Sequence, residues 1–118
     1  MFNVIIAGGR DFKDYELLKK SANFLLQNIP EECIQIISGM ASGADTLGYK
    51  YAIECGYPCL KFPAKWDVHG KAAGHIRNKD MAEHADALIA FWDGKSRGTK
   101  DMIDIAKQKN IMYRIVYY

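Results

Sequence analysis

NVIIAGGRD (residues 3–11) is the stretch that decides the fold, because a short apolar run ends directly in two glycines and two charged residues. An uninterrupted apolar run predicts a strand that is buried on both faces. The same arrangement recurs in IQIISGMASGAD (residues 34–45) and in ALIAFWDGKSRGT (residues 87–99). A helical pattern follows each stretch, and there backbone N–H groups and a helix N-terminus can receive a phosphate. Three such loops in one small chain predict a nucleotide-type pocket.

Strands and helices alternate along the whole chain. The predicted strands are Asn3–Ala7, Ile34–Ile37, Pro58–Phe62, Ala87–Phe91 and Ile111–Val116. Four helices are predicted. The first is capped by Asp14 and carries Phe24 on its apolar face, and the others are Ala44–Cys55, one through Ile76–Ala85, and Thr99–Gln108. This order predicts an α/β fold, a Rossmann-like three-layer sandwich whose five-stranded parallel sheet has the order 3-2-1-4-5. We expect a single domain over residues 1–118.

Composition limits the classes of function. The chain has 118 residues, of which 49% are hydrophobic and 25% charged, so it can bury a core without disulfides or metal. A formal net charge of only +2 predicts no large basic face, which makes nucleic acid an unlikely partner. No apolar run approaches the roughly 18 residues that span a bilayer, and no signal-type segment is present, so we expect no membrane contact and a cytoplasmic location.

The cysteines and histidines do not form a metal-binding pattern. Cys33, Cys55 and Cys59 are an odd number, which does not fit a disulfide framework, and we expect reduced, buried thiols. Their spacing matches no zinc motif, and the histidines are no better placed. The sequence therefore predicts no metal site.

The first loop holds Gly8, Gly9, Arg10 and Asp11. The glycine pair is either a tight turn that needs positive φ or backbone brought close to an anion. Arg10 can clamp a phosphate or a carboxylate with two parallel hydrogen bonds. Asp11 either caps the following helix or accepts a hydrogen bond from a ribose hydroxyl.

The second loop opens a helix with small residues, Ser38-Gly39 and Gly43-Ala44. Small side chains let the backbone approach a ligand, although the same residues also fit a compact turn in which Ser38 donates a local hydrogen bond. Asp45 lies in the first turn of the helix, where a carboxylate is favourable against the helix dipole. It is also a candidate catalytic carboxylate.

The third loop combines Trp92, Asp93, Gly94, Ser96, Gly98 and Thr99. Gly94–Gly98 matches the G-x-S-x-G pattern of serine hydrolases, but no histidine follows Ser96 to act as the base. A Walker A loop is excluded as well, since the required earlier glycine is Ile89. The remaining glycine-rich loop, with its hydroxyls, basic neighbours and helix N-terminus, suits a phosphate.

A long connection over residues 63–74 leads into the third helix. Long irregular loops in compact domains are often functional lids. Trp66 and Trp92 each either stack on a base or pack against the protein, while His69 and His75 fit exposed loop positions. Arg77, on the first turn of the helix and followed by Asn78, is the strongest single candidate side chain, both for phosphate binding and for catalysis.

The last strand carries Tyr113 and Tyr117, followed by Tyr118. These side chains can serve a sheet edge or a contact between subunits, so a homo-oligomer is possible, and simple packing is an equal alternative.

Taken together, these motifs resemble the YspA-like branch of the SLOG superfamily over nearly the whole chain. The resemblance rests on GGRDF (residues 8–12), SGMASGAD (38–45), Pro63-Ala64 with Trp66, AGHIRN (73–78) with Met81, and WDGKSRGT (92–99). The superfamily joins the DNA-processing Smf/DprA proteins with LOG-type phosphoribohydrolases on a Rossmann-like fold. The resemblance implies a nucleotide-derived ligand and a role as sensor or processor in phage and bacterial conflict systems.

The resemblance also locates a departure from the enzymes of the superfamily. Those relatives place a catalytic glutamate three residues after the threonine of the third loop, paired with an upstream arginine that Arg77 resembles. Here that position is Met102, with Asp101 one residue earlier. A methionine cannot activate water or stabilise an oxocarbenium-like centre. Asp11, Asp45 or Asp93 remains as a candidate to supply a carboxylate from another part of the pocket.

Three hypotheses follow from the sequence. The first is a binding domain in which the three loops hold a nucleotide-like ligand, with Arg10 and Arg77 on its phosphate. The second is an enzyme that cleaves the N-glycosidic bond of nucleoside monophosphates or related compounds. The third, a DNA-associated protein like the Smf relatives, is the weakest because the charge is nearly balanced.

Overall fold

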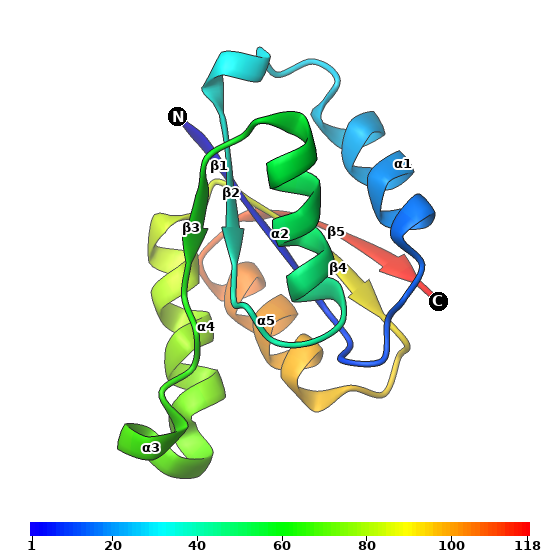
Figure 1. Ribbon diagram of the computed structural model, residues 1–118. Helices are drawn as coiled ribbons and strands as arrows, with labels where there is room; N and C mark the ends of the chain where they lie inside the picture. Colours follow the sequence, from blue (N-terminus) through cyan, green and yellow to red (C-terminus); the bar gives the residue numbers. More distant parts are fainter.

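The computed structural model describes all residues from Met1 to Tyr118 and contains one five-stranded sheet in the order β3-β2-β1-β4-β5 (Figure 1). Every neighbouring pair of strands is parallel. The predicted sheet and its order are therefore confirmed. The strands are β1 (Phe2–Gly8), β2 (Ile34–Ser38), β3 (Cys59–Lys61), β4 (Ala87–Trp92) and β5 (Met112–Tyr117).

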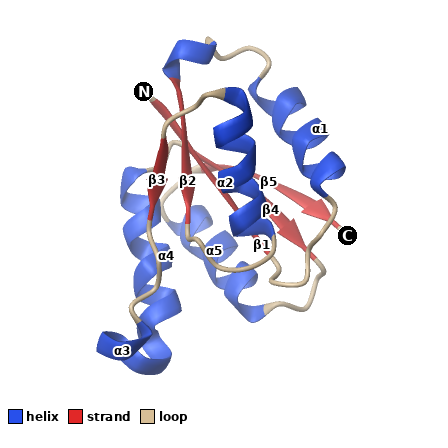
Figure 2. Ribbon diagram, in the orientation of Figure 1, coloured by secondary structure: helices blue, strands red, loops and turns tan.

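Helices cover both faces of the sheet and complete three layers (Figure 2). One face packs against α1 (Tyr15–Leu26) and α2 (Ala44–Cys55), and the other against α4 (Ala73–His84) and α5 (Arg97–Gln108). Alternation along β1 divides its side chains between the two cores, with Val4 and Ile6 in the first and Ile5 and Ala7 in the second. A strand buried on both faces explains the continuous apolar run.

Local sequence sets the ends of several helices. The Asp14 carboxylate accepts a hydrogen bond from the Leu17 N–H at 3.1 Å, so it caps α1 as predicted. Gly56 ends α2 in the left-handed conformation, at φ 74°. Ser96 caps α5, which begins at Arg97, two residues before the predicted start. The sequence thus locates these ends to within two residues.

The connection after β3 is helical where the sequence predicts an irregular loop. It contains the short helix α3 (Trp66–His69) and a 3₁₀ turn, η2 (Gly70–Ala72), and a further 3₁₀ turn, η1 (Glu31–Cys33), precedes β2. The following helix α4 begins at Ala73. Arg77 therefore lies in the second turn of its helix, and its expected place in the first turn is wrong.

Two predictions of burial are also wrong. Cys33 and Cys55 are exposed and Cys59 is half-buried, although all three are free thiols as expected. The side chain of Phe24 is 67% exposed, because it projects from the outer side of α1. Of the terminal tyrosines, Tyr113 and Tyr117 are exposed on the edge strand β5. No helix of the structure is long and apolar enough to cross a membrane.

Candidate functional site

A cavity of about 620 Å³ opens at the carboxyl edge of the sheet. The loops after β1, β2 and β4 contribute to its walls, and α2, α3, η2, α4 and α5 contribute the rest. In the strand order, β1 is the switch point, with β2 on one side and β4 on the other. Ligands of open α/β sheets bind in the crevice outside this point. The cavity thus lies where the predicted topology places a ligand.

The loop after β1 owes its glycines to close packing. A side chain at Gly8 would meet the Phe91 carbonyl, and one at Gly9 would meet the Tyr118 hydroxyl. Neither residue has positive φ, so the first of the two alternatives, a turn that needs positive φ, is wrong. The two glycines instead admit the backbone of β4 and the side chain of Tyr118.

Asp11 neither caps α1 nor is left unpartnered. Its carboxylate accepts a hydrogen bond from the Tyr118 hydroxyl at 2.6 Å. Burial and this carboxylate raise the pKa of Tyr118, since both disfavour the charged phenolate. The bond fixes the chain's last residue against the first loop, and Asp11 still lines the cavity.

Arg10 and Trp66 form the rim of the cavity. The Arg10 guanidinium carbon lies 5.8 Å from the centroid of the Trp66 ring, within the range of a cation–π contact. Trp66 is 50% exposed and both residues line the cavity. An exposed indole at this position presents a flat surface on which an aromatic ring can stack.

The loop after β2 is closed on itself. The Ser38 hydroxyl donates to the Asp45 carbonyl at 2.8 Å and accepts from the Met40 N–H at 3.1 Å. The Ala44 N–H donates to the Gly9 carbonyl at 3.1 Å. Of the two alternatives from the sequence, the structure shows the compact turn with Ser38 as donor. Of the N–H groups at the start of α2, those of Ala44 and Thr46 are already engaged within the protein.

The packing of the β2 loop against the β1 loop requires a glycine at position 43. Its φ is 83°, and a side chain there would meet the backbone of Gly9 and Arg10. The β2 loop therefore packs backbone against backbone on the β1 loop. Gly43 acts in packing between loops rather than in lining the cavity.

Asp45 is a buried carboxylate at the floor of the cavity, with its side chain 6% exposed. Burial raises its pKa from 3.8 to about 6, although the Arg77 charge and the backbone N–H groups of Ala41 and Gly8 act in the opposite direction. The nearest Arg77 nitrogen lies 3.9 Å from the carboxylate. Desolvation thus outweighs the ion pair.

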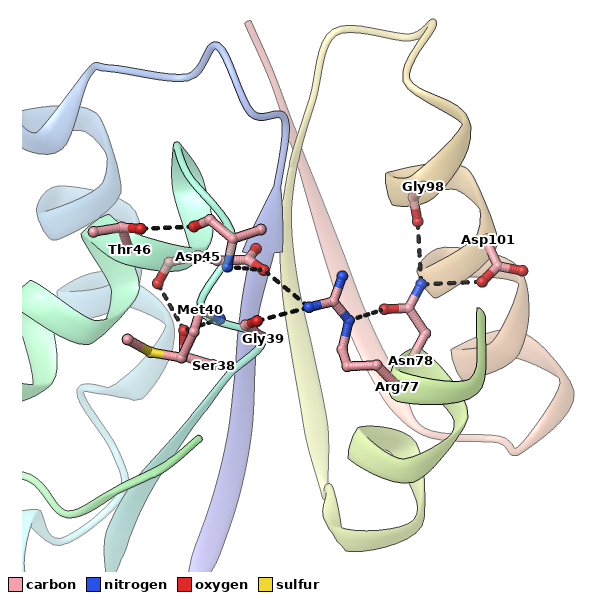
Figure 3. Close-up of polar contacts among 10 residues, drawn as sticks. Ser38, Gly39, Met40, Asp45, Thr46, Arg77, Asn78, Gly98 and Asp101 are labelled. Atoms are coloured by element: carbon pink, nitrogen blue, oxygen red, sulfur yellow. Dashed lines mark hydrogen bonds and ion pairs between the residues drawn. The ribbon is translucent and has the colours of Figure 1, made fainter. Parts of the chain in front are cut away.

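Arg77 joins the two halves of the site (Figure 3). Its Nη1 donates to the Gly39 carbonyl at 2.7 Å, and its Nε donates to Asn78 Oδ1 at 3.0 Å. Burial lowers the pKa of Arg77, and Asp45 opposes that change. Two of the five guanidinium N–H donors are therefore used within the protein, where they hold α4 against the β2 loop.

The network continues from Asn78 into α5 (Figure 3). Asn78 Nδ2 donates to Asp101 Oδ2 at 3.0 Å. The other Asp101 oxygen contacts His75 Nδ1 at 2.8 Å. His75, Asn78 and Asp101 all line the cavity, so one polar chain crosses it from α2 to α5.

The loop after β4 is shaped by Asp93. Its carboxylate accepts from the N–H groups of Lys95 and Ser96, both at 2.8 Å. These hydrogen bonds lower the pKa of Asp93. The Trp92 indole donates to the Ser96 carbonyl at 3.0 Å and packs on Tyr117. Trp92 therefore has the packing role that the sequence left as an alternative to base stacking.

Two pairs of backbone N–H groups at the cavity have no partner in the protein. They belong to Arg10 and Asp11 at the tip of the first loop, and to Arg97 and Gly98 in the first turn of α5. The Ser96 hydroxyl instead accepts from the Thr99 N–H. The open donors lie after β1 and after β4, on both sides of the crevice.

A group of three or more His, Cys, Asp or Glu side chains that could hold a metal ion is absent from the structure.

Comparison with known proteins bears on this geometry. A model of the YspA, cpYpsA-related SLOG family matches residues 2–69. The chain belongs to this family. The matched residues include the loops after β1 and β2 and end at α3. The SLOG-family match therefore covers these two loops and Trp66.

Among curated proteins, this SLOG-family chain is 30% identical to the Gene 61 protein of Mycobacterium phage D29 over 117 residues, which cover 94% of this chain and 93% of that protein. Among solved structures, it resembles DNA processing protein A (DprA) of Streptococcus pneumoniae, with a TM-score of 0.71 and 19% identity. It also resembles DprA of Helicobacter pylori, with a TM-score of 0.65 and 18% identity; that structure was described for its single-stranded DNA binding mode.

Both DprA matches cover 97% of this chain, but only 49% and 64% of the respective DprA chains. The SLOG-family chain thus spans about half of one DprA chain and less than two thirds of the other. At these identities the likeness shows a shared fold.

The cavity gathers twelve of the residues predicted from the sequence and leaves six outside its lining. Those that line it are Gly8, Gly9, Arg10, Asp11, Asp45, Trp66, Arg77, Asn78, Asp93, Ser96, Gly98 and Thr99. Those outside it are Ser38, Gly39, Gly43, Ala44, Trp92 and Gly94. The second group consists mainly of residues that shape the β2 loop.

Four polar residues of the cavity were not predicted as site residues: Lys71, His75, Arg97 and Asp101. A sequence signal for two of them exists. His75 and Asn78 are three residues apart, so they share a face once α4 is taken to begin at Ala73. Asp101 is four residues after Arg97, one turn from the helix start. Lys71 lies in the 3₁₀ turn, which no sequence pattern indicates.

Proposed function

We propose that this chain binds a nucleotide-derived anionic ligand in the cavity. The observation that carries the proposal is the pair of open donor sites that face one crevice, the N–H groups of Arg10 and Asp11 and those of Arg97 and Gly98. Unpartnered N–H groups at a helix N-terminus and in a loop bind phosphate well. The proposed phosphate position is the N-terminus of α5 rather than the N-terminus of α2.

Charge and size support this assignment. The side chains of Arg10, Lys71 and Arg97 are exposed and line the cavity, so they can offset the charge of phosphate groups. A volume of about 620 Å³ lies within the range of small-molecule sites. Trp66 provides the stacking surface for a base. The carboxylates of Asp11 and Asp93 are placed to accept from ribose hydroxyls.

Calorimetry with AMP, ADP, ADP-ribose and cyclic nucleotides tests the proposal. Arg97→Ala and Arg10→Ala each remove one exposed cation that the fold does not use in a hydrogen bond, and we expect at least a tenfold loss of affinity, as for one charge-assisted hydrogen bond. Arg114→Ala, on β5 outside the cavity, is the matched control. Unchanged affinity in both cavity variants, or no binding of any nucleotide, contradicts the proposal.

A second candidate function is binding of single-stranded DNA, and a separate hollow favours it. This hollow of about 310 Å³ includes Lys61, Lys65 and His69 and shares Arg77 with the cavity. Basic side chains therefore continue from the cavity along β3 and α3, as a longer phosphate backbone would need.

Fluorescence anisotropy with a labelled oligothymidylate at low and high salt tests this second candidate. We expect binding that weakens steeply with salt, and a further loss in Lys65→Ala that does not affect mononucleotide binding. Equal affinity of Lys65→Ala and the unmodified chain for the oligonucleotide contradicts it.

A further inference from the structure

His75 and Asp101 form a hydrogen-bonded pair inside the cavity. His75 Nδ1 lies 2.8 Å from Asp101 Oδ1, while Asp101 Oδ2 accepts from Asn78 Nδ2 at 3.0 Å. Both carboxylate oxygens are engaged, so the carboxylate is held in one orientation. Opposite a carboxylate, Nδ1 carries the proton, which leaves Nε2 of the neutral ring as a free lone pair. The His75 side chain is 54% exposed and lines the cavity, so a ligand can reach it.

The pair adjoins the proposed phosphate position. Asp101 lies one turn after Arg97 on α5, and Asn78, which orients Asp101, also donates to the Gly98 carbonyl at 3.4 Å. The first turn of α5 thus supplies the open N–H groups, and its second turn supplies the partner of the histidine. A phosphorus atom bound at Gly98 has a base close by.

Resting on the proposed function, we propose that His75 is a general base that hydrolyses a phosphodiester of the bound nucleotide. Water is the nucleophile, because the Ser96 hydroxyl is engaged with Thr99. A diester is the favoured class, since the second negative charge of a monoester repels an incoming hydroxide-like oxygen. A histidine oriented by a carboxylate, with its other nitrogen free, is the arrangement that general-base catalysis requires.

The proposed step balances without a redox partner. The water oxygen forms a bond to phosphorus while Nε2 of His75 accepts one water proton. The bond between phosphorus and the leaving ribose oxygen breaks, and its electron pair stays on that oxygen, which takes the proton from His75. A diester and water become a monoester and an alcohol. Asp101 stabilises the transient imidazolium, so it is a positioning residue.

The assay incubates the chain with 2′,3′-cyclic AMP, 3′,5′-cyclic AMP and the dinucleotide ApA, and detects products by ³¹P NMR and chromatography. We expect a phosphomonoester from at least one of them. His75→Ala should lower kcat at least about 100-fold, as for loss of a general base. His84→Ala, an exposed histidine that lines neither the cavity nor the neighbouring hollow, is the matched control and should retain the rate.

Asp101→Asn tests the positioning role. Asn78 is fixed with Nδ2 toward position 101, because its Oδ1 accepts from Arg77 Nε. The new amide must then turn its oxygen to Asn78 and its NH₂ group to His75 Nδ1. That moves the ring proton to Nε2 and removes the base, so kcat should fall about 100-fold or more while KM stays within about twofold.

Binding separates this inference from the proposed function. Thermal shift and calorimetry with hydrolysis-resistant phosphorothioate analogues of the same compounds should show equal affinity for the unmodified chain and His75→Ala. Binding without turnover at high protein concentration overturns the inference and leaves the proposed function standing, as does an undiminished rate in His75→Ala. Release of free base instead of a phosphomonoester overturns it in favour of N-glycosidic cleavage. If none of these compounds binds, the inference fails, and the proposed function fails with it only when AMP, ADP and ADP-ribose do not bind either.

Discussion

Replacing Asp45 by asparagine should stabilise the protein at neutral and alkaline pH. The carboxylate is buried at the cavity floor, and its pKa rises from 3.8 to about 6 in the folded state. A folded-state pKa above the unfolded one means that the folded protein prefers the protonated form. Stability from this group is therefore complete below about pH 4 and is lost as the pH rises to about 6. Each pKa unit corresponds to about 1.4 kcal/mol, so the loss is about 3 kcal/mol.

The neutral amide of Asp45→Asn carries no charge to desolvate, yet its oxygen can still accept from the Ala41 N–H. The pKa of about 6 already includes the attraction between Arg77 and the Asp45 carboxylate. This attraction therefore does not change the expectation that the asparagine variant is the more stable one. We expect the variant to match the unmodified chain at about pH 4. At about pH 8 its free energy of unfolding should be higher by about 3 kcal/mol, as an upper limit.

Urea unfolding of both chains between about pH 4 and pH 8 measures this difference. Subtracting the two curves cancels the titration of every other group, so the change with pH belongs to Asp45. Asp104→Asn is the matched control, because Asp104 is an exposed member of an ion pair with Lys100 and should contribute less than about 1 kcal/mol. A difference that does not depend on pH, or a variant that is less stable at about pH 8, refutes the reasoning.

Four further substitutions test the loops and the helix ends by urea unfolding. Gly43→Ala and Gly56→Ala should each lower the free energy of unfolding by about 1 kcal/mol, because both positions have positive φ. Only at Gly43 does the new methyl group meet backbone atoms, so Gly43→Ala should cost at least about 2 kcal/mol more. Equal losses at the two glycines contradict this. Asp14→Ala removes the α1 cap and should cost about 1 kcal/mol; no measurable loss would mean that the cap is dispensable. Tyr118→Phe removes the bond to Asp11 and should cost about 1 to 2 kcal/mol, and an unchanged midpoint would show that the last residue is not held by it.

The fold follows from the sequence because its signals are local. Continuous apolar runs such as Val4 to Ala7 and glycines such as Gly56 mark element ends without reference to the rest of the chain. Helix α2 was predicted with the observed bounds, Ala44–Cys55, since a glycine flanks it on each side. The parallel order of the sheet then follows from alternation and right-handed crossovers.

The site follows only in part, because its contacts join distant residues. Asp11 and Tyr118 are 107 residues apart, and nothing around either one indicates their bond. The closure of the β2 loop depends on a carbonyl of the β1 loop, so its N–H groups looked open in the sequence. The glycines and small residues of the sequence predicted which loops lie close together. Which backbone N–H groups in those loops stay without a hydrogen-bond partner depends on the three-dimensional packing.

Position 102 shows how this distinction bears on chemistry. Met102 is 1% exposed, packs in the core between the sheet and α5 and also lines the cavity, so a carboxylate there would lose most of its hydration. Its neighbour Asp101 is half-buried, lines the cavity and binds His75 and Asn78. The absence of a glutamate at position 102 therefore does not leave the cavity without a carboxylate. In the mechanism that we propose, this carboxylate supports His75 and does not itself contact the ligand.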